Sequence, residues 1–220
     1  LLRPLLRPPP RRPHLHRLRR LPRLPVPHLH HPPCHPYLWP RRQSLRGLLL
    51  PLLRGAARRH DLPDRAFRNR ASLVSVAFPR SLASIGSGAF EGCSSLLSID
   101  LPAGLTSIGG CAFLGCSSLP TVTLPAGLTS IGSLAFVRCS SLVSVAFPAG
   151  LTSIGDNAFE HCSALSYVTL PAGLTSVGNS AFYRCSALSS VTFPAGLTSI
   201  DECAFWGCPS LATVTFPATL

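Results

Sequence analysis

Apolar and polar residues recur along this chain with a fixed period of 23 residues. Six full units align without a gap from Phe78 to Thr215, and the unit from Leu101 to Thr123 reads LPAGLTSIGGCAFLGCSSLPTVT. A repeat of this length is typical of a solenoid, in which each unit forms one coil and stacks on the next. One unit buries too few apolar side chains to offset the entropy of ordering its backbone, so we expect the units to fold only as a stack.

Two short strands are predicted in each unit. The residues around Val122 alternate between polar and apolar, which predicts a strand with Val122 facing inward. In the same unit, Pro102 and the Ala103-Gly104 pair predict a turn. The apolar residues Leu105 and Ile108 then predict a second extended segment. Stacking should place equivalent strands side by side in a parallel sheet.

The rest of the unit predicts a sharp change of direction. We expect a positive φ at Gly109, because Asp201, a residue type that tolerates this conformation, replaces it in the last unit. Residues 110–116 are expected to form a single helical turn with small and apolar side chains facing inward. One phenylalanine per unit should form an internal spine, made of Phe67, Phe90, Phe113, Phe136, Phe159, Phe182 and Phe205.

The pattern LPxxLTSIGxxAFxxCSSLxSVxLP resembles the BspA-like class of leucine-rich repeats over about residues 64–220. The resemblance implies a right-handed solenoid of 23-residue coils with a parallel β-sheet, between mainly β and α/β in class. It also implies a cell-surface or secreted protein that takes part in adhesion or protein recognition. We therefore predict a solenoid over residues 62–220, with six full repeats in 78–215 and partial repeats at both ends, preceded by a disordered leader over residues 1–61.

Charge separates these two parts. Residues 1–60 contain 14 of the 20 arginines, whereas all eight acidic residues follow this segment. Frequent prolines and the absence of a periodic apolar face predict disorder in the leader. Four interpretations stay open: a polyanion-binding segment, an organelle transit peptide, a basic linker, or a non-functional translation of C-rich DNA. Nucleic acid is therefore expected as a partner only through the leader.

The nine cysteines do not predict a disulfide framework. Six of them occupy one repeat position, and we expect a row of buried free thiols there. Cys111 and Cys203 share a variable position, so we expect them to be exposed and more reactive. The buried row consists of Cys93, Cys116, Cys139, Cys162, Cys185 and Cys208.

No residue grouping predicts an enzyme, a cofactor or a metal site. His161, beside Glu160 and near Asp156, lacks a distinct nucleophile and is interpreted as a surface histidine. Cys34 and its neighbouring histidines lack the paired spacing of a structural zinc site; these are His28, His30, His31 and His35. No apolar run reaches the roughly 20 residues of a membrane span. The chain contains no methionine, so we expect either a fragment of a longer protein or an uncertain gene model.

Two sets of side chains are candidate contacts with a protein or glycan partner. The first is the outward-facing array beside the inward valines, represented by Thr121, Thr123, Ser144, Tyr167, Thr169, Ser190 and Thr192. The second consists of Tyr183, Arg184 and Trp206, residue types that favour interfaces. They occupy positions that vary between units, as do Leu134, Val137 and Arg138. Regular threonine pairs in the first set leave a structural or ice-binding surface as the alternative function. The last unit shows no polar cap, so we expect either that the natural protein continues with more repeats or a cap, or that this chain associates edge to edge.

Overall fold

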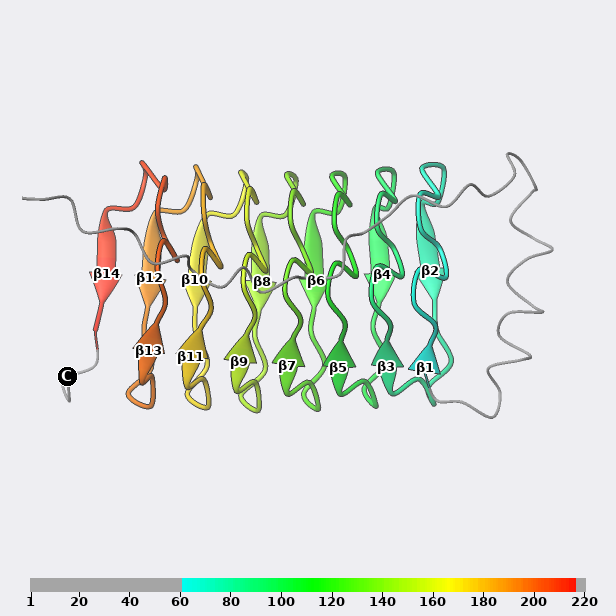
Figure 1. The fold of residues 1–220 in the computed structure, drawn as a ribbon, viewed down its shortest axis with the longest axis horizontal. Helices are drawn as coiled ribbons and strands as arrows, with labels where there is room; N and C mark the ends of the chain where they lie inside the picture. The colour runs from blue at the N-terminus through cyan, green and yellow to red at the C-terminus, as the bar shows by residue number, and fades with distance from the viewer. Residues whose placement is uncertain (1–60, 217–220) are drawn as a thin grey trace, which may run out of the picture. The chain divides into compact units, whose positions relative to one another are not determined.

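The structure of the protein is a computed structural model that describes residues 61–216. These residues form a parallel β-solenoid of 23-residue coils, each with two short strands (Figure 1). Paired residues in neighbouring coils are 23 positions apart, as Ser107 and Ser130 are. The predicted solenoid is therefore confirmed, while the predicted leader lies almost entirely outside the described residues. No helix within residues 61–216 is long and apolar enough to cross a bilayer.

Two-residue strands form one continuous parallel sheet along one face of the solenoid. Each strand places a half-buried serine beside a buried isoleucine or valine in the inner coils, so one side of the strand contacts the core. The seven strands, in spatial order, are β1 (Asp61–Leu62), β3 (Ser84–Ile85), β5 (Ser107–Ile108), β7 (Ser130–Ile131), β9 (Ser153–Ile154), β11 (Ser176–Val177) and β13 (Ser199–Ile200).

Three-residue strands form a second face, which we call the strand face. Their middle residue is buried, except in the last strand, and their outer residues face solvent, as the alternation predicted. These strands form three separate ladders, β2-β4, β6-β8 and β10-β12-β14, rather than one sheet. The strands are β2 (Ser75–Ala77), β4 (Ser98–Asp100), β6 (Thr121–Thr123), β8 (Ser144–Ala146), β10 (Tyr167–Thr169), β12 (Ser190–Thr192) and β14 (Thr213–Thr215).

The coils are spread apart at the two breaks in this face, between β4 and β6 and between β8 and β10 (Figure 1). In other coils, the residue just before the strand donates its N–H to the preceding coil, as Val143 does to Pro120 at 2.9 Å. Pro120 has no N–H and cannot make this bond to the coil before it. The missing bond accounts for part of the first break. Nothing in the structure explains the second, where Ser166 still donates to Val143.

The phenylalanine spine runs through the core as predicted. Successive rings stack with centroids 5.1–5.3 Å apart and interplanar angles of at most 13°. Five of the seven rings are fully buried. A second set of phenylalanines meets this spine edge-on, including Phe147 against Phe159 at 5.6 Å. Equivalent residues therefore contact each other directly from coil to coil.

The prediction of a helical turn over residues 110–116 was wrong. The segment forms consecutive turns in which local and inter-coil hydrogen bonds alternate. Cys111 and Phe113 donate their N–H groups to Ser133 and Ala135 of the next coil, at 2.9 and 2.7 Å. The N–H of the intervening Ala112 turns back to the carbonyl three residues earlier. Left-handed φ values at two positions per coil, 57° at Cys111 and 74° at Gly115, produce this alternation and prevent a helix.

The positive φ predicted for Gly109 and Asp201 was also wrong. Neither residue has a left-handed backbone. Gly109 is needed because the preceding coil approaches closely: a Cβ there would lie 2.8 Å from the backbone of Gly86. A Cβ at Gly132 would lie 2.6 Å from the backbone nitrogen of Gly110. Glycine is therefore used at this position because the coils approach closely, and not because the backbone has an unusual φ.

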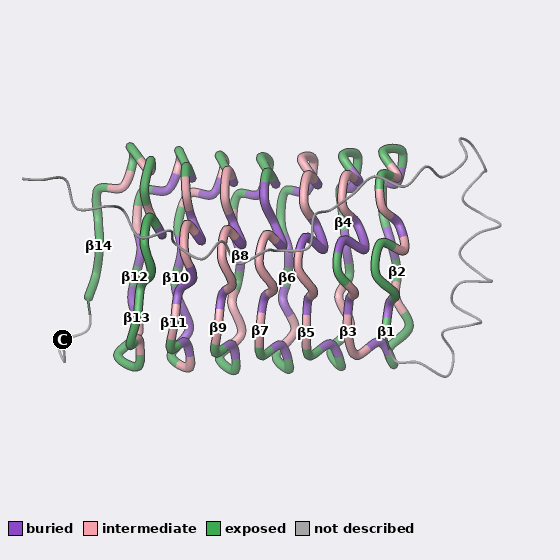
Figure 2. Tube along the Cα trace, in the orientation of Figure 1, coloured by how far each residue is buried: buried purple, intermediate pink, exposed green. Residues whose placement is uncertain are grey.

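The last described coil is more open than the inner coils (Figure 2). Ile200 and Val214 are each 42 % exposed, whereas equivalent residues in the inner coils are buried. Phe205 is only half-buried, as expected for a residue with a covering coil on one side alone. Self-association through this edge stays a prediction.

Candidate interaction surface

The residue after each spine phenylalanine forms a row on the outside of the turns. We call this the outer row: Arg68, Glu91, Leu114, Val137, Glu160, Tyr183 and Trp206. Unlike the spine, it changes from coil to coil, yet some neighbours within it interact specifically. At one end, Arg68 Nη2 forms an ion pair with Glu91 Oε1 at 2.7 Å. Val137, at one of the positions identified as variable, is buried, with 7 % exposure.

At the other end, the outer row contributes to an aromatic cluster of Tyr183, Trp206, Arg184 and His161. The Tyr183 and Trp206 rings stack with centroids 5.0 Å apart and an interplanar angle of 12°. Arg184 Cζ lies 5.3 Å from the Tyr183 centroid and 5.6 Å from the Trp206 centroid, within cation–π range. His161 approaches Tyr183 edge-on at 6.0 Å. The structure thus brings together the three residues that the sequence identified only as separate interface types.

The backbone fixes the position of this cluster. Arg184 and His161 have left-handed φ values of 56° and 59°, which turn their side chains out of the coil. The Arg184 N–H donates to the Trp206 carbonyl of the next coil at 2.8 Å, and the His161 N–H donates to Tyr183 at 2.8 Å. Each member is therefore tied to the neighbouring coil that supplies its contact. Trp206, in the last described coil, is 56 % exposed.

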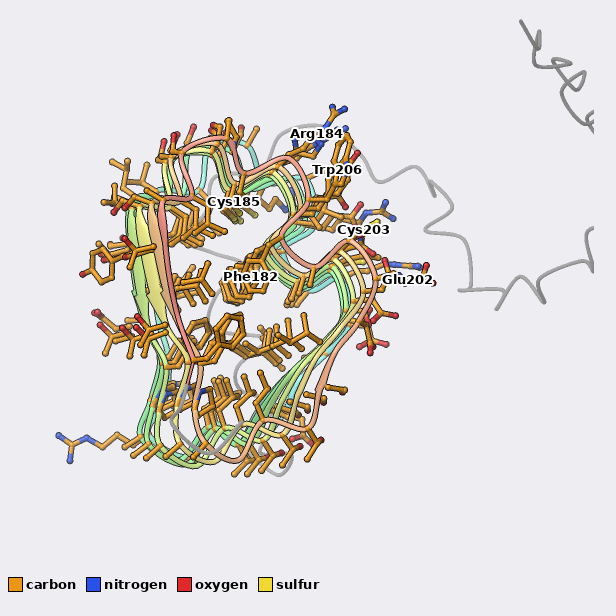
Figure 3. All side chains as sticks on the ribbon, turned by 90° about the vertical axis from the view of Figure 1, so that its left-hand side faces the viewer. Phe182, Arg184, Cys185, Glu202, Cys203 and Trp206 are labelled. Atoms are coloured by element: carbon orange, nitrogen blue, oxygen red, sulfur yellow. The ribbon has the colours of Figure 1, made fainter. Side chains whose placement is uncertain are left out.

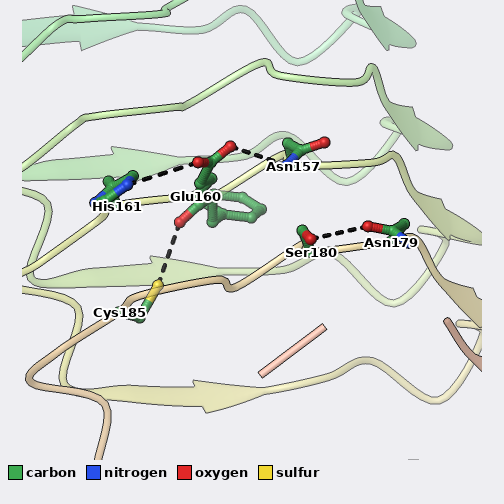
Figure 4. Close-up of polar contacts among 7 residues, drawn as sticks. Asn157, Glu160, His161, Asn179, Ser180 and Cys185 are labelled. Carbon is green, nitrogen blue, oxygen red and sulfur yellow. Dashed lines mark hydrogen bonds and ion pairs between the residues drawn. The ribbon is translucent and has the colours of Figure 1, made fainter. Parts of the chain in front are cut away.

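Polar contacts beside the cluster hold the side chain of Glu160 in place (Figure 4). His161 Nε2 lies 3.6 Å from Glu160 Oε1, while the Asn157 amide donates to Glu160 Oε2 at 2.8 Å. On the next coil, the Ser180 hydroxyl donates to Asn179 Oδ1 at 2.8 Å. Both carboxylate oxygens of Glu160 thus have structural partners. Residues 61–216 contain no group of three or more His, Cys, Asp or Glu side chains suited to hold a metal ion.

The first predicted set lies on the strand face, away from the aromatic cluster. In Figure 3 the three-residue strands form one side of the coil, and Arg184 and Trp206 project from the opposite, upper side. Tyr167 is the most prominent member of the set, with 52 % exposure. The other members are exposed (Thr121, Thr123, Thr169 and Thr192) or partly exposed (Ser144 and Ser190). The two predicted sets therefore belong to separate surfaces.

The thiol row lies inside the coils, as predicted, and all described cysteines are free. Each thiol of the row donates to the carbonyl of a spine phenylalanine 26 residues earlier; Cys139 Sγ reaches Phe113 O at 3.2 Å. Cys203 is exposed as expected. Cys111 is buried, with 7 % exposure, which corrects the prediction for that residue. It occupies an inner coil with a coil on either side, whereas Cys203 lies in the last described coil.

Burial makes the thiols of this row poor nucleophiles. Loss of hydration raises the pKa of Cys139 to about 12, although a hydrogen bond with the backbone of Cys116 opposes the shift. Burial also raises the pKa of Cys93 to about 11 and the pKa of Cys162 well above its usual range. These groups stay protonated at neutral pH and serve as small buried donors.

Comparison with known families agrees with this geometry. The model for the BspA type leucine rich repeat region, with six copies, matches residues 60–185 and 107–220. The chain belongs to the BspA-type leucine-rich repeat family. The BspA-type pattern thus extends over the whole described solenoid. A search among curated proteins finds no significant match.

Two solved structures resemble the solenoid. A leucine-rich repeat protein from T. pallidum is 32% identical, with a TM-score of 0.51, and the match covers 73% of this chain and 63% of that protein. A leucine rich cell surface protein from Faecalibacterium prausnitzii A2-165 is 25% identical, with a TM-score of 0.56 and coverage of 71% and 51%. The chain thus spans less than two thirds of the length of either protein.

Proposed function

We propose that this chain is a non-enzymatic binding module for adhesion or protein recognition at a cell surface, with the aromatic cluster as its principal contact. The observation that carries the proposal is the mutual packing of Tyr183, Arg184 and Trp206 outside the solenoid. Trp, Tyr and Arg contribute most of the binding energy in many protein interfaces. Their clustering at adjacent positions favours one site rather than three scattered contacts.

Preorganisation supports this choice of site. The two rings and the guanidinium are already ordered by contacts with each other and by hydrogen bonds between coils. A partner would therefore lose less conformational entropy in fixing them than it would with isolated side chains. The repeat scaffold of the family and the similarity to a protein described as a cell surface protein agree with a recognition role.

A binding screen tests the proposal directly. The full chain, immobilised, is tested against purified extracellular proteins and a glycan array, and we expect a protein partner. Trp206→Ala should weaken the binding of that partner by about 2 kcal/mol, or roughly thirtyfold in the dissociation constant. Arg184→Lys should also weaken it, because lysine keeps the charge but loses the planar group that packs on the rings.

Tyr167→Ala is the matched control, since it removes an exposed aromatic ring from the strand face. The proposal expects little change in affinity for this variant. If binding is unchanged in Trp206→Ala but lost in Tyr167→Ala, the binding site lies on the strand face instead. A glycan ligand sensitive to Trp206→Ala would replace the protein partner, and substrate turnover lost in His161→Ala would contradict a non-enzymatic role.

The ice-binding alternative needs a flat, regular hydroxyl array. On the strand face, Asp100, Ala146 and Tyr167 interrupt the array, and the two breaks between ladders interrupt it further. We therefore expect no thermal hysteresis at millimolar protein. Measurable hysteresis that survives Tyr167→Ala would revive this alternative.

A further inference from the structure

A groove opens on the strand face at the first break between ladders. It has a volume of about 430 Å³ and lies between the coils of β4 and β6, beyond the point where Pro120 removes a hydrogen-bond donor. Its lining comes from both coils: Ile99, Asp100, Leu101 and Ala103 on one side, and Thr123, Pro125 and Ala126 on the other. Pro120 itself, just before β6, does not belong to the lining.

The lining combines apolar side chains, exposed polar atoms and one charge. Five of the seven residues are apolar, and Asp100 is the only charged residue at the outward positions of β2 to β14. Within residues 61–216, no ion pair satisfies the Asp100 carboxylate. In the other coils this position holds alanine or threonine. Asp100 therefore makes this groove chemically distinct from the rest of the strand face.

We propose that this groove binds a basic side chain, lysine or arginine, presented by a partner protein. The methylene groups of such a side chain would lie on Ile99, Leu101 and Pro125, and its cation would reach the carboxylate of Asp100. Lysine and arginine combine a long apolar stem with a terminal charge, which matches this lining. The groove is a second contact, independent of the aromatic cluster.

Small probes test the groove without knowledge of the partner. Uniformly ¹⁵N-labelled full chain is titrated with N-acetyl-arginine amide, N-acetyl-lysine amide and the neutral isostere N-acetyl-citrulline amide. We expect saturable shifts of the Ile99, Leu101 and Ala126 amides with the two cations, with dissociation constants in the millimolar range expected for such small ligands. Asp100→Asn should weaken the binding of both cations about threefold to fivefold, the size expected of a partly exposed ion pair. Equal shifts with citrulline, or no loss in Asp100→Asn, would overturn the proposal.

Two matched variants separate the groove from simple charge attraction. Ala126→Leu should fill the groove and abolish the shifts although Asp100 remains. Ala172→Leu, at the equivalent exposed position two coils away, should leave them unchanged. Arg80→Ala, which removes the cation in the coil beside Ala103, should strengthen binding slightly. Shifts that persist in Ala126→Leu, or that spread equally to Asp156 and Glu202, would contradict a defined site. Trp206→Ala should not affect this titration. The groove proposal can therefore fail independently of the proposed function.

Discussion

Phe182 and Tyr183 are neighbours in the sequence, yet the position of Phe182 is constant from coil to coil, whereas that of Tyr183 varies. Phe182 lies in the spine, where every coil has the same residue and each ring stacks on an identical ring. Tyr183 lies in the outer row, where the residue changes in almost every coil. The comparison teaches that stacking requires identity inside the solenoid, whereas outside it requires only a compatible neighbour. Repetition therefore specifies the fold, and the departures from repetition indicate the candidate sites.

The outer row shows how compatible neighbours replace identical ones. The pairs Arg68–Glu91 and Tyr183–Trp206 use different chemistry at the same structural position, one an ion pair and the other a ring stack. Both involve side chains on adjacent coils. The scaffold thus allows several local surfaces without a change in its core.

The strongest test of the spine removes one of its central rings. Phe136→Ala deletes a fully buried ring that stacks on Phe113 and Phe159, and should cost about 3–5 kcal/mol of unfolding free energy. Phe205→Ala, at the half-buried end of the spine, should cost clearly less. Urea unfolding followed by circular dichroism measures both. Equal costs would show that the stack is not what stabilises the inner coils.

A glycine substitution tests the close approach of the coils. The added methyl of Gly132→Ala would lie 2.6 Å from the backbone nitrogen of Gly110, so we expect a loss of about 1–3 kcal/mol. Gly127→Ala is the control, because its Cβ would meet only atoms at 3.5 Å. Thermal unfolding compares the two. A tolerated Gly132→Ala would mean that the coils can separate at this position.

The thiol row gives a smaller effect. Cys139→Ala should cost about 1–2 kcal/mol, since it removes a small buried group. A buried hydroxyl without an acceptor would make Cys139→Ser more costly than Cys139→Ala. The structure provides the Phe113 carbonyl 3.2 Å from the sulfur as an acceptor, so we now expect serine to cost no more than alanine. A clearly worse serine variant would show that this hydrogen bond contributes nothing. Reducing agent should leave the unfolding midpoint of the native protein unchanged.

The same thiols predict a pH dependence. Burial raises the pKa of Cys139 from an ordinary value near 9 to about 12, so the unfolded chain loses this proton more readily than the folded one. The stabilising contribution is fully present below pH 9 and is lost as the pH rises towards 12. The difference in urea midpoint between the native protein and Cys139→Ala should therefore shrink between pH 8 and pH 10.5. A constant difference over this range would contradict the shift.

Much of the fold could be predicted because the repeat reports the same environment many times. Strand positions, the spine and the thiol row all follow from one aligned unit. The turn around Cys111 could not be predicted in detail, because residue types as different as leucine, arginine and serine adopt a left-handed φ there and at the equivalent positions. The role of Gly109 depends on the distance between coils, which no local pattern records.

The candidate sites were less predictable, because they depend on contacts between coils. The 23-residue spacing of Tyr183 and Trp206 was a usable signal, since equal repeat positions must lie on adjacent coils. Pro120 was another signal, because a proline beside a central strand removes a rung of the ladder. The groove itself needed the structure, since the breaks on the strand face do not all coincide with a proline.

The division between a stabilising interior and a recognising exterior is tested most directly by comparing Phe182→Ala with Tyr183→Ala. Urea unfolding is measured on both variants of the chain. Partner affinity is measured without urea, at a low temperature where both variants remain folded. We predict a loss of about 3–5 kcal/mol in stability for Phe182→Ala. For Tyr183→Ala, we predict a loss of about 0.5–1.5 kcal/mol in stability together with loss of partner binding. Similar stability losses in the two variants, or partner binding that survives Tyr183→Ala, would contradict the account.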